Sequence, residues 1–312
     1  MSSTPGPAAA APSQQISCSN CGATTDFEVT ANVLKCAFCG SEQVVSQPSD
    51  PNRPTPEAIL SFVVEEEQAR AAYREWLGNG FFRPGDLAKS ASLREIRSVF
   101  LPFWAFDARA VTQWTAMSGR HRTSVRQVQT VVNGQTVLRD QQVQETDWFP
   151  ASGDHFGQYT WELVSASKGL EQGWVDAIEP FNFGELREYD GKYLLGRGAE
   201  EAALDRAQAE DVARQLIESK EQAECERLVP GDTHRDLRVS TSLDGVTARM
   251  LYLPVWLAAF AYKQKVYRFV VNGQTGKVTG EAPTSYIKVA LVVGAVVFVI
   301  LLIVAIVAMA SR

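Results

Sequence analysis

Four cysteines near the N-terminus have the spacing of a metal site. Cys18 and Cys21 form one C-x-x-C-G motif, and Cys36 and Cys39 form a second one. A two-residue spacing lets both thiolates of a motif bind the same ion, and four thiolates complete the tetrahedral coordination that Zn²⁺ prefers. Because sulfur would fill every position, no coordination site stays open for catalysis, and we expect a structural zinc ion. A redox C-x-x-C pair is the alternative, but that chemistry is typical of a single motif beside a βαβ unit.

Residues 16–46 around these cysteines are expected to form a zinc ribbon. This segment carries Asp26, Glu28 and Glu42 against a single basic residue, Lys35, and the whole chain has a formal net charge of −6. A zinc ion bound by four thiolates adds a formal double negative charge. Such a surface repels nucleic-acid phosphates, so we expect the ribbon to recognise protein rather than nucleic acid.

The C-terminal segment has the length and composition of a membrane span. Residues 289–310 are 22 positions without a charged, amide or hydroxyl side chain. A helix of this length covers about 33 Å, enough for a hydrocarbon core of about 30 Å. Tyr286 and Lys288 precede it, where an aromatic ring and a cation suit the membrane–water interface. We therefore expect one transmembrane helix over 286–310 in a lipid bilayer; a buried core helix is the alternative.

The expected topology follows from what lies upstream of this span. No earlier segment is apolar enough to cross a membrane, and residues 1–15 lack the basic start and apolar core of a secretory signal. The basic residues between Lys263 and Lys288 agree with the positive-inside bias. We expect a single-pass protein of the cell membrane with its N-terminus in the cytoplasm.

The body of the chain contains a repeated pattern. LPFWAFDARA, which begins at Leu101, is echoed by LPVWLAAFAY at Leu253, and VVNGQT occurs at Val131 and again at Val270. Residues of high β propensity precede each Asn-Gly pair, which predicts a β-hairpin with a primed turn in each copy.

Two segments of the body have helical periodicity, residues 65–77 and residues 199–228. The second is expected to turn one apolar side inward, formed by Leu204, Val212, Leu216 and Ile217. The sequence therefore predicts an α+β fold with a zinc ribbon, a duplicated antiparallel β-hairpin and helix body, and one C-terminal transmembrane helix. The expected division is a tail at 1–15, the ribbon at 16–46, a Pro-rich linker at 47–56, α+β modules at 57–198 and 199–285, and the span at 286–310.

Motifs of known enzyme classes are missing from the sequence. It has no Walker loop, no dinucleotide-binding glycine motif, no H-E-x-x-H and no G-x-S-x-G. Asp154 and His155 could form an acid–base pair, but adjacent residues rarely face each other, and we expect a surface turn there. Cys225 is expected to be a packed side chain rather than a nucleophile, and no enzymatic activity is expected.

Two other groups of residues have a structural and a functional interpretation. The aromatic residues of the repeat, Trp104 and Trp256, could form a ligand platform, but core packing against a sheet is preferred. The basic cluster around His121, residues 119–122, could contact lipid headgroups, and a solvated hairpin face is preferred.

With the ribbon, the repeat and the terminal helix together, the chain resembles a bacterial family of transcription factor IIB-type zinc-ribbon membrane proteins. The stretch LPVWLAAFAYKQKVYRFVVNGQTGKVTGEAP is the part most similar to that family. Its members often carry names taken from the primosomal replication helicase, whose nucleotide-binding motifs are absent from this sequence. The resemblance implies a zinc site at Cys18, Cys21, Cys36 and Cys39, and an adaptor role toward envelope-stress or flotillin-like proteins.

The leading functional expectation is a tail-anchored adaptor that presents a protein-docking surface at the cytoplasmic face of the membrane. One alternative is a zinc-ribbon nucleic-acid-binding protein. The other is a membrane-bound enzyme with an unrecognised site, which would contain a polar pocket with perturbed titratable groups.

Overall fold

The computed structural model describes residues 14–19, 24–27, 44–48, 54–132, 135–194 and 197–310, and within these ranges the fold is a mixture of α and β structure, as expected. Backbone contacts divide the chain into two units that are each discontinuous in sequence. Unit 1 comprises Met1–Phe103, Ser165–Asp205 and Met250–Arg312, and unit 2 comprises Trp104–Val164 and Arg206–Arg249. Three of the four boundaries fall within long strands, β5 (Ser92–Val132), β6 (Gln135–Ser165) and β9 (Thr233–Tyr262), and the fourth lies just before Arg206.

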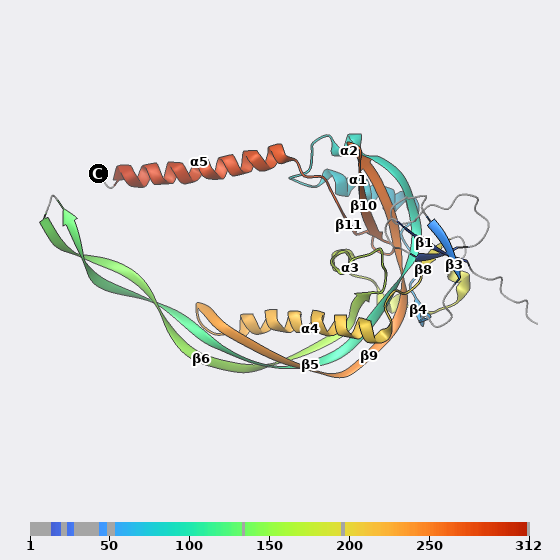
Figure 1. Ribbon diagram of the computed structural model, residues 1–312, viewed down its shortest axis with the longest axis horizontal. Helices are drawn as coiled ribbons and strands as arrows, with labels where there is room; N and C mark the ends of the chain where they lie inside the picture. The colour runs from blue at the N-terminus through green and yellow to red at the C-terminus, as the bar shows by residue number, and fades with distance from the viewer. Residues whose placement is uncertain are drawn as a thin grey trace, which may run out of the picture. The chain divides into compact units, whose positions relative to one another are not determined.

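One sheet contains all eleven described strands (Figure 1). The two LPxW segments lie on neighbouring strands, because Leu101 belongs to β5 and Leu253 to β9. Two short strands join at the side of β9: β4 (Ala58–Ile59), parallel to β9, and β7 (Arg187–Glu188), antiparallel to β4. The order along the sheet is β11 (Val278–Gly280), β10 (Lys265–Asn272), β9, β5, β8 (Gly198–Glu200), β2 (Thr24–Phe27), β1 (Gln14–Cys18) and β3 (Val44–Pro48).

Short helices accompany the sheet of unit 1. Helix α1 confirms the helix predicted over 65–77: Glu65 and Gln68 form a capping box at its start, and its buried residues repeat every four positions. The described helical elements of this unit are α1 (Glu66–Gly78), α2 (Leu87–Ser90), α3 (Gln172–Ile178), two 3₁₀ turns at Phe183–Glu185 and Gly191–Leu194, and α5 (Tyr286–Ala310).

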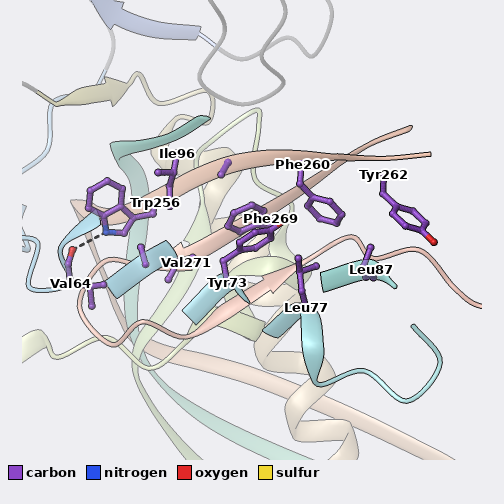
Figure 2. Packing of buried hydrophobic residues seen from close by; sticks show 12 residues of the cluster. Val64, Tyr73, Leu77, Leu87, Ile96, Trp256, Phe260, Tyr262, Phe269 and Val271 are labelled. Carbon is purple, nitrogen blue, oxygen red and sulfur yellow. Dashed lines mark hydrogen bonds between the residues drawn. The ribbon is translucent and has the colours of Figure 1, made fainter. Parts of the chain in front are cut away.

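The core of unit 1 lies between α1 and strands β9 and β10 (Figure 2). The Tyr73 ring of α1 stacks on Phe269 with 4.1 Å between ring centroids, and both rings lie near Phe260. Trp256 donates a hydrogen bond of 2.9 Å from Nε1 to the Val64 carbonyl. Trp256 is 5% exposed and Trp104 is 6% exposed, so the preferred interpretation of both as core residues is confirmed.

The hairpin turns differ between the two copies of the repeat. In the first copy, β5 and β6 pair and are separated by two residues, Asn133 and Gly134, which lie outside the described residues. In the second copy, the primed turn is at Lys263–Gln264 between β9 and β10, where φ is 46° and 66°. The prediction of a primed turn at the second Asn-Gly pair was wrong, because that pair begins a five-residue connection from β10 to β11.

The buried side chain of Asn272 explains this longer connection. Its amide nitrogen donates to the carbonyls of Ile178 and Pro180, at 2.9 and 3.1 Å, and its Oδ1 accepts from the amides of Gln274 and Thr275. An asparagine used in this way satisfies backbone groups of a loop and of the C-terminal end of α3 at once. Asn272 therefore connects this loop to α3 and does not form the corner of a two-residue turn.

Unit 2 consists of the β5–β6 hairpin, the first part of β9 and helix α4 (Arg206–Leu228). The helix predicted over 199–228 begins only at Arg206, because residues 198–200 form β8. Two small apolar clusters join α4 to the strands, one around Ile217 and one around Cys225. The buried positions of α4 repeat every four residues and are Ala209, Ala213, Ile217, Glu221 and Cys225.

The C-terminal segment forms one continuous apolar helix, α5, as the sequence predicted. Tyr286–Met309 is 24 residues with a mean hydropathy of 3.5 in its most apolar stretch, and no residue of that stretch is buried. A soluble fold would bury a helix of this composition, so its length and uniform apolar surface suit a bilayer.

Candidate functional site

The backbone around the predicted zinc ligands is described in part. Cys18 is the last residue of β1, and its side chain, together with Cys21, Cys36 and Cys39, lies outside the described residues. β1 pairs antiparallel with both β2 and β3, with Ser17 opposite Thr24 and Cys18 opposite Val44. Thus the chain segments that lead out of the first motif and into β3 meet at the same end of a three-stranded arrangement.

A polar cluster that the sequence analysis did not identify lies in unit 2. Glu221 of α4 is fully buried, and its carboxylate accepts two short hydrogen bonds from β6. His155 donates from Nδ1 to Oε2 at 2.7 Å, and the Tyr159 hydroxyl donates to Oε1 at 2.7 Å. Thr112 of β5 also bonds to this carboxylate and shares a 3.0 Å hydrogen bond with Thr241 of β9. We call Glu221, His155, Tyr159 and Thr112 the Glu221 cluster.

The Glu221 cluster keeps its carboxylate ionised. Burial by itself raises the pKa of Glu221, but the hydrogen bonds from His155, Thr112 and Tyr159 outweigh it and leave the pKa below its ordinary value of 4.5. The pKa of the Tyr159 hydroxyl is strongly raised, first by burial and then by the hydrogen bond to Glu221 and the charge of that carboxylate. The phenol therefore stays protonated and remains a donor.

The local sequence makes room for this carboxylate. Glu221 occupies one position of the four-residue stripe by which α4 faces the strands, where the other positions are Ala, Ile or Cys. On β6, a Cβ at Gly157 would lie 2.1 Å from Glu221 Oε1 and 2.8 Å from the Tyr159 ring. Only a residue without a side chain fits between these two groups.

The expectation of a surface turn at Asp154 and His155 was wrong, because both residues lie within strand β6. Exposure alternates along this part of the strand, so Asp154 points to solvent while His155 points to Glu221. The two adjacent residues therefore do not face each other, and this part of the argument from the sequence was right. The partner of His155 is instead a carboxylate 66 positions further along the chain.

The remaining sequence-based interpretations concern residues of unit 2. Cys225 is fully buried beside Trp114 and Ala116, and burial followed by the charge of Glu221 raises the pKa of its thiol, which confirms a packed side chain. His121 is exposed on β5, and its backbone amide donates to Asp232 at 2.7 Å. This exposure fits the solvated face expected around His121, and it fits contact with lipid headgroups equally well, so the preference for a solvated face stays a prediction.

The Glu221 cluster fixes α4 to the strands. Each donor that reaches the carboxylate comes from a strand, and the carboxylate itself comes from the helix. Lys220, the neighbouring residue of α4, adds a contact to Glu162 of β6 at 2.6 Å. An open cavity of about 530 Å³ lies along the exposed side of α4, lined by residues such as Gln215, Gln222 and Ser240 and by no member of the cluster. The Glu221 cluster therefore holds α4 in place against the strands.

Comparison with known proteins adds one relative. No known protein-family profile matches the chain, and no solved structure matches it. A protein of Bacillus subtilis (strain 168), described as uncharacterized protein YdjG, is 28% identical over 238 residues. The match covers 75% of this chain and 66% of the relative, so the chain spans slightly less than two thirds of that protein's length.

Proposed function

We propose that this protein is a tail-anchored adaptor, in which α5 holds an α+β body and a zinc ribbon at the cytoplasmic face of the cell membrane. The observation that carries the proposal is α5, a 24-residue apolar span whose most hydrophobic stretch contains no buried residue. Exposed apolar surface of that extent is stable in lipid and not in water. The fold then serves to present surfaces to other membrane-associated proteins.

The zinc ribbon is part of the proposal through its donor set. Four cysteine thiolates in two C-x-x-C-G motifs suit Zn²⁺, which would stabilise the N-terminal segment without taking part in a reaction. The register of β1 with β2 and β3 supports this assignment, because Cys18 and Val44 are opposite each other. Val44 follows the second motif by only a few residues, so both motifs are within reach of the same end of the strands. This is also the arrangement that the resemblance to the transcription factor IIB-type zinc-ribbon membrane proteins implies.

The experiment for the adaptor role compares partners captured from membranes by the full chain and by two variants. Cys36→Ser removes one proposed zinc ligand, while Cys225→Ala removes a thiol that lies in the core of unit 2. We expect Cys36→Ser to lose the proteins that the wild type captures and Cys225→Ala to keep them. An identical set of captured proteins for all three chains would refute docking through the ribbon.

The alternative of a membrane-bound enzyme draws on the Glu221 cluster, because perturbed pKa values of Glu221 and Tyr159 are of the kind found in active sites. The hydrogen bonds of this carboxylate are made to protein groups, which favours a structural role. Under the adaptor proposal, His155→Gln leaves partner capture unchanged. The nucleic-acid alternative predicts salt-dependent binding of DNA or RNA, which the acidic ribbon disfavours.

A further inference from the structure

The turn before α2 exposes two adjacent aromatic rings. Phe81 is 72% exposed and Phe82 is 45% exposed, and their rings contact each other edge to face with 5.1 Å between centroids. The turn is nevertheless held firmly, because Arg83 places its guanidinium over the Trp76 ring at 3.9 Å and donates to the Trp76 carbonyl. This rigid turn directs two phenylalanines outward, and it therefore presents an apolar surface that can pack into an apolar environment such as lipid.

A backbone hydrogen bond ties this turn to the start of the membrane span. The amide of Ser285 donates to the Phe82 carbonyl at 2.7 Å, and α5 begins at the next residue. When α5 is in a bilayer, residue 285 lies at the membrane–water interface, and Phe82 must lie at the same depth. Aromatic rings at that depth stabilise the position of a membrane protein.

A cavity of about 510 Å³ lies at the same place, between the turn, the tip of the β9–β10 hairpin and the first residues of α5. Two lysines of the hairpin, Lys263 and Lys265, line it together with Tyr262, Tyr267 and Ser285. Asp86 is the carboxylate in its lining, and it accepts a hydrogen bond of 2.9 Å from the Tyr262 hydroxyl. Two cations against one carboxylate leave the cavity with a positive charge.

We propose that this cavity binds the phosphate headgroup of an anionic phospholipid of the same bilayer that α5 spans, with Phe81 and Phe82 inserted among the lipids beside it. The hairpin lysines supply cations for the phosphate, and hydroxyl groups of the lining supply hydrogen-bond donors. The apolar turn lies next to the charged cavity, just as the acyl chains of a phospholipid lie next to its charged headgroup. The proposal rests on the anchoring of α5 in a membrane.

The headgroup site is tested with the full chain in neutral detergent micelles. Hydrogen exchange of peptides that cover residues 84–86 and 262–267 is followed while short-chain phosphatidylglycerol, short-chain phosphatidylcholine or inorganic phosphate is added. We expect protection by phosphatidylglycerol alone. Equal protection by inorganic phosphate would assign the site to a free anion and overturn the proposal, and so would the absence of protection by any of the three.

Matched double variants show whether the two lysines act specifically. Lys263→Gln with Lys265→Gln is compared with Lys168→Gln and Lys192→Gln, which remove the same charge from exposed positions of unit 1 outside the cavity. Each lysine near a lipid phosphate contributes about fivefold to affinity, so we expect about 25-fold weaker binding for the first pair and no change for the second. An equal effect of both pairs would mean an unspecific charge effect and would overturn the site.

The aromatic turn is tested in vesicles whose acyl chains carry bromine, which quenches tryptophan inside the bilayer. Phe81→Trp adds a tryptophan to the turn, and Val63→Trp adds one at a position with similar exposure, 63%. Val63 bonds to Gly273, just past the end of β10 away from Lys265, and the eight residues of β10 span about 27 Å. We expect bromination to quench most of the fluorescence added at position 81 and none of that added at position 63.

An alkaline wash of the same vesicles separates this proposal from the anchoring of α5. If the chain stays with the vesicles and the tryptophan at position 81 is not quenched, the inserted turn is refuted while the anchor stands. If the chain leaves the vesicles, the anchor is refuted and the lipid site with it.

Discussion

The Glu221 cluster makes a quantitative prediction for the attachment of α4. Glu221→Leu keeps most of the side-chain volume but removes the acceptor of the His155 and Tyr159 hydrogen bonds, both 2.7 Å long. A hydrogen bond to a charged group is worth about 1.5–3 kcal/mol, and both donors are near enough to solvent to regain some hydration. We therefore take the lower value for each bond and expect α4 to lose about 3 kcal/mol of local stability.

Cys225 is a natural reporter for this loss. It is fully buried one turn beyond Glu221 on the same helix, so an alkylating reagent reaches it only when α4 leaves the strands. A loss of about 3 kcal/mol corresponds to an opening equilibrium about 150-fold more favourable. We expect the alkylation rate of Cys225, measured at neutral pH by mass spectrometry of its peptide in the full chain, to rise by that factor.

Glu218→Leu is the matched control, because Glu218 lies on the exposed side of α4. A surface substitution usually changes stability by less than about 0.5 kcal/mol, so the alkylation rate should change by about twofold or less. If Glu221→Leu and Glu218→Leu had the same effect, the carboxylate would not hold the helix, and the assignment of the cluster as an attachment would be refuted.

Four further predictions follow from the same structure. Because the pKa of Glu221 is lowered in the folded protein, its contribution to stability is present above pH 4.5 and is lost as the pH falls through the folded pKa. The difference in amide hydrogen exchange of α4 between wild type and Glu221→Gln should therefore shrink in acid and not in base. Gly157→Ala places a Cβ 2.1 Å from Glu221 Oε1 and should accelerate Cys225 alkylation, whereas Gly173→Ala, with open space around its Cβ, should not. Phe269→Ala removes a ring that is 1% exposed and stacked on Tyr73, and should lower the unfolding free energy of unit 1 by about 3–5 kcal/mol in denaturant titrations followed by hydrogen exchange, with Val63→Ala nearly neutral. Elemental analysis of the purified full chain should find one zinc ion per chain, lost in Cys36→Ser and kept in Cys225→Ala, and a metal-free wild type would contradict the ribbon.

The elements with strong local signals were predicted well from the sequence. The span of α5 follows from an unbroken apolar run, and α1 follows from a four-residue periodicity with a capping pair at Glu65 and Gln68. Trp104 and Trp256 were assigned correctly to the core because large aromatic residues in β-rich segments usually pack there. For α1 and for the two tryptophans, the local sequence and the tertiary environment favour the same state.

The parts that depend on distant contacts were not predictable in the same way. The second Asn-Gly pair has the local signature of a two-residue turn, but the Asn272 side chain bonds to the carbonyls of Ile178 and Pro180, and the connection from β10 to β11 takes five residues. The local preference was overruled by a contact more than 90 residues away in the chain. His155 was misplaced for the same reason, since its partner Glu221 comes from another element.

One signal in the sequence could have revealed the Glu221 cluster. A carboxylate stands at a spacing of four in a row of small and apolar residues on α4, between Ile217 and Cys225. A glutamate in such a stripe must find donors on the facing element. The sequence analysis instead placed Val212 and Leu216 on the inner side of α4, and so did not identify the stripe that contains Glu221. Both residues lie at the edge of the buried face and are half-exposed.

The anchoring of α5 is tested most directly by alkaline extraction of membranes from cells that express the full chain. The measurement compares wild type with a variant carrying Leu301→Lys and Val304→Lys, since each charge in the middle of a span costs about 2.5–3.5 kcal/mol on insertion. We predict that the wild-type chain stays in the membrane pellet and that the double variant is released. Wild-type protein in the supernatant would contradict the account.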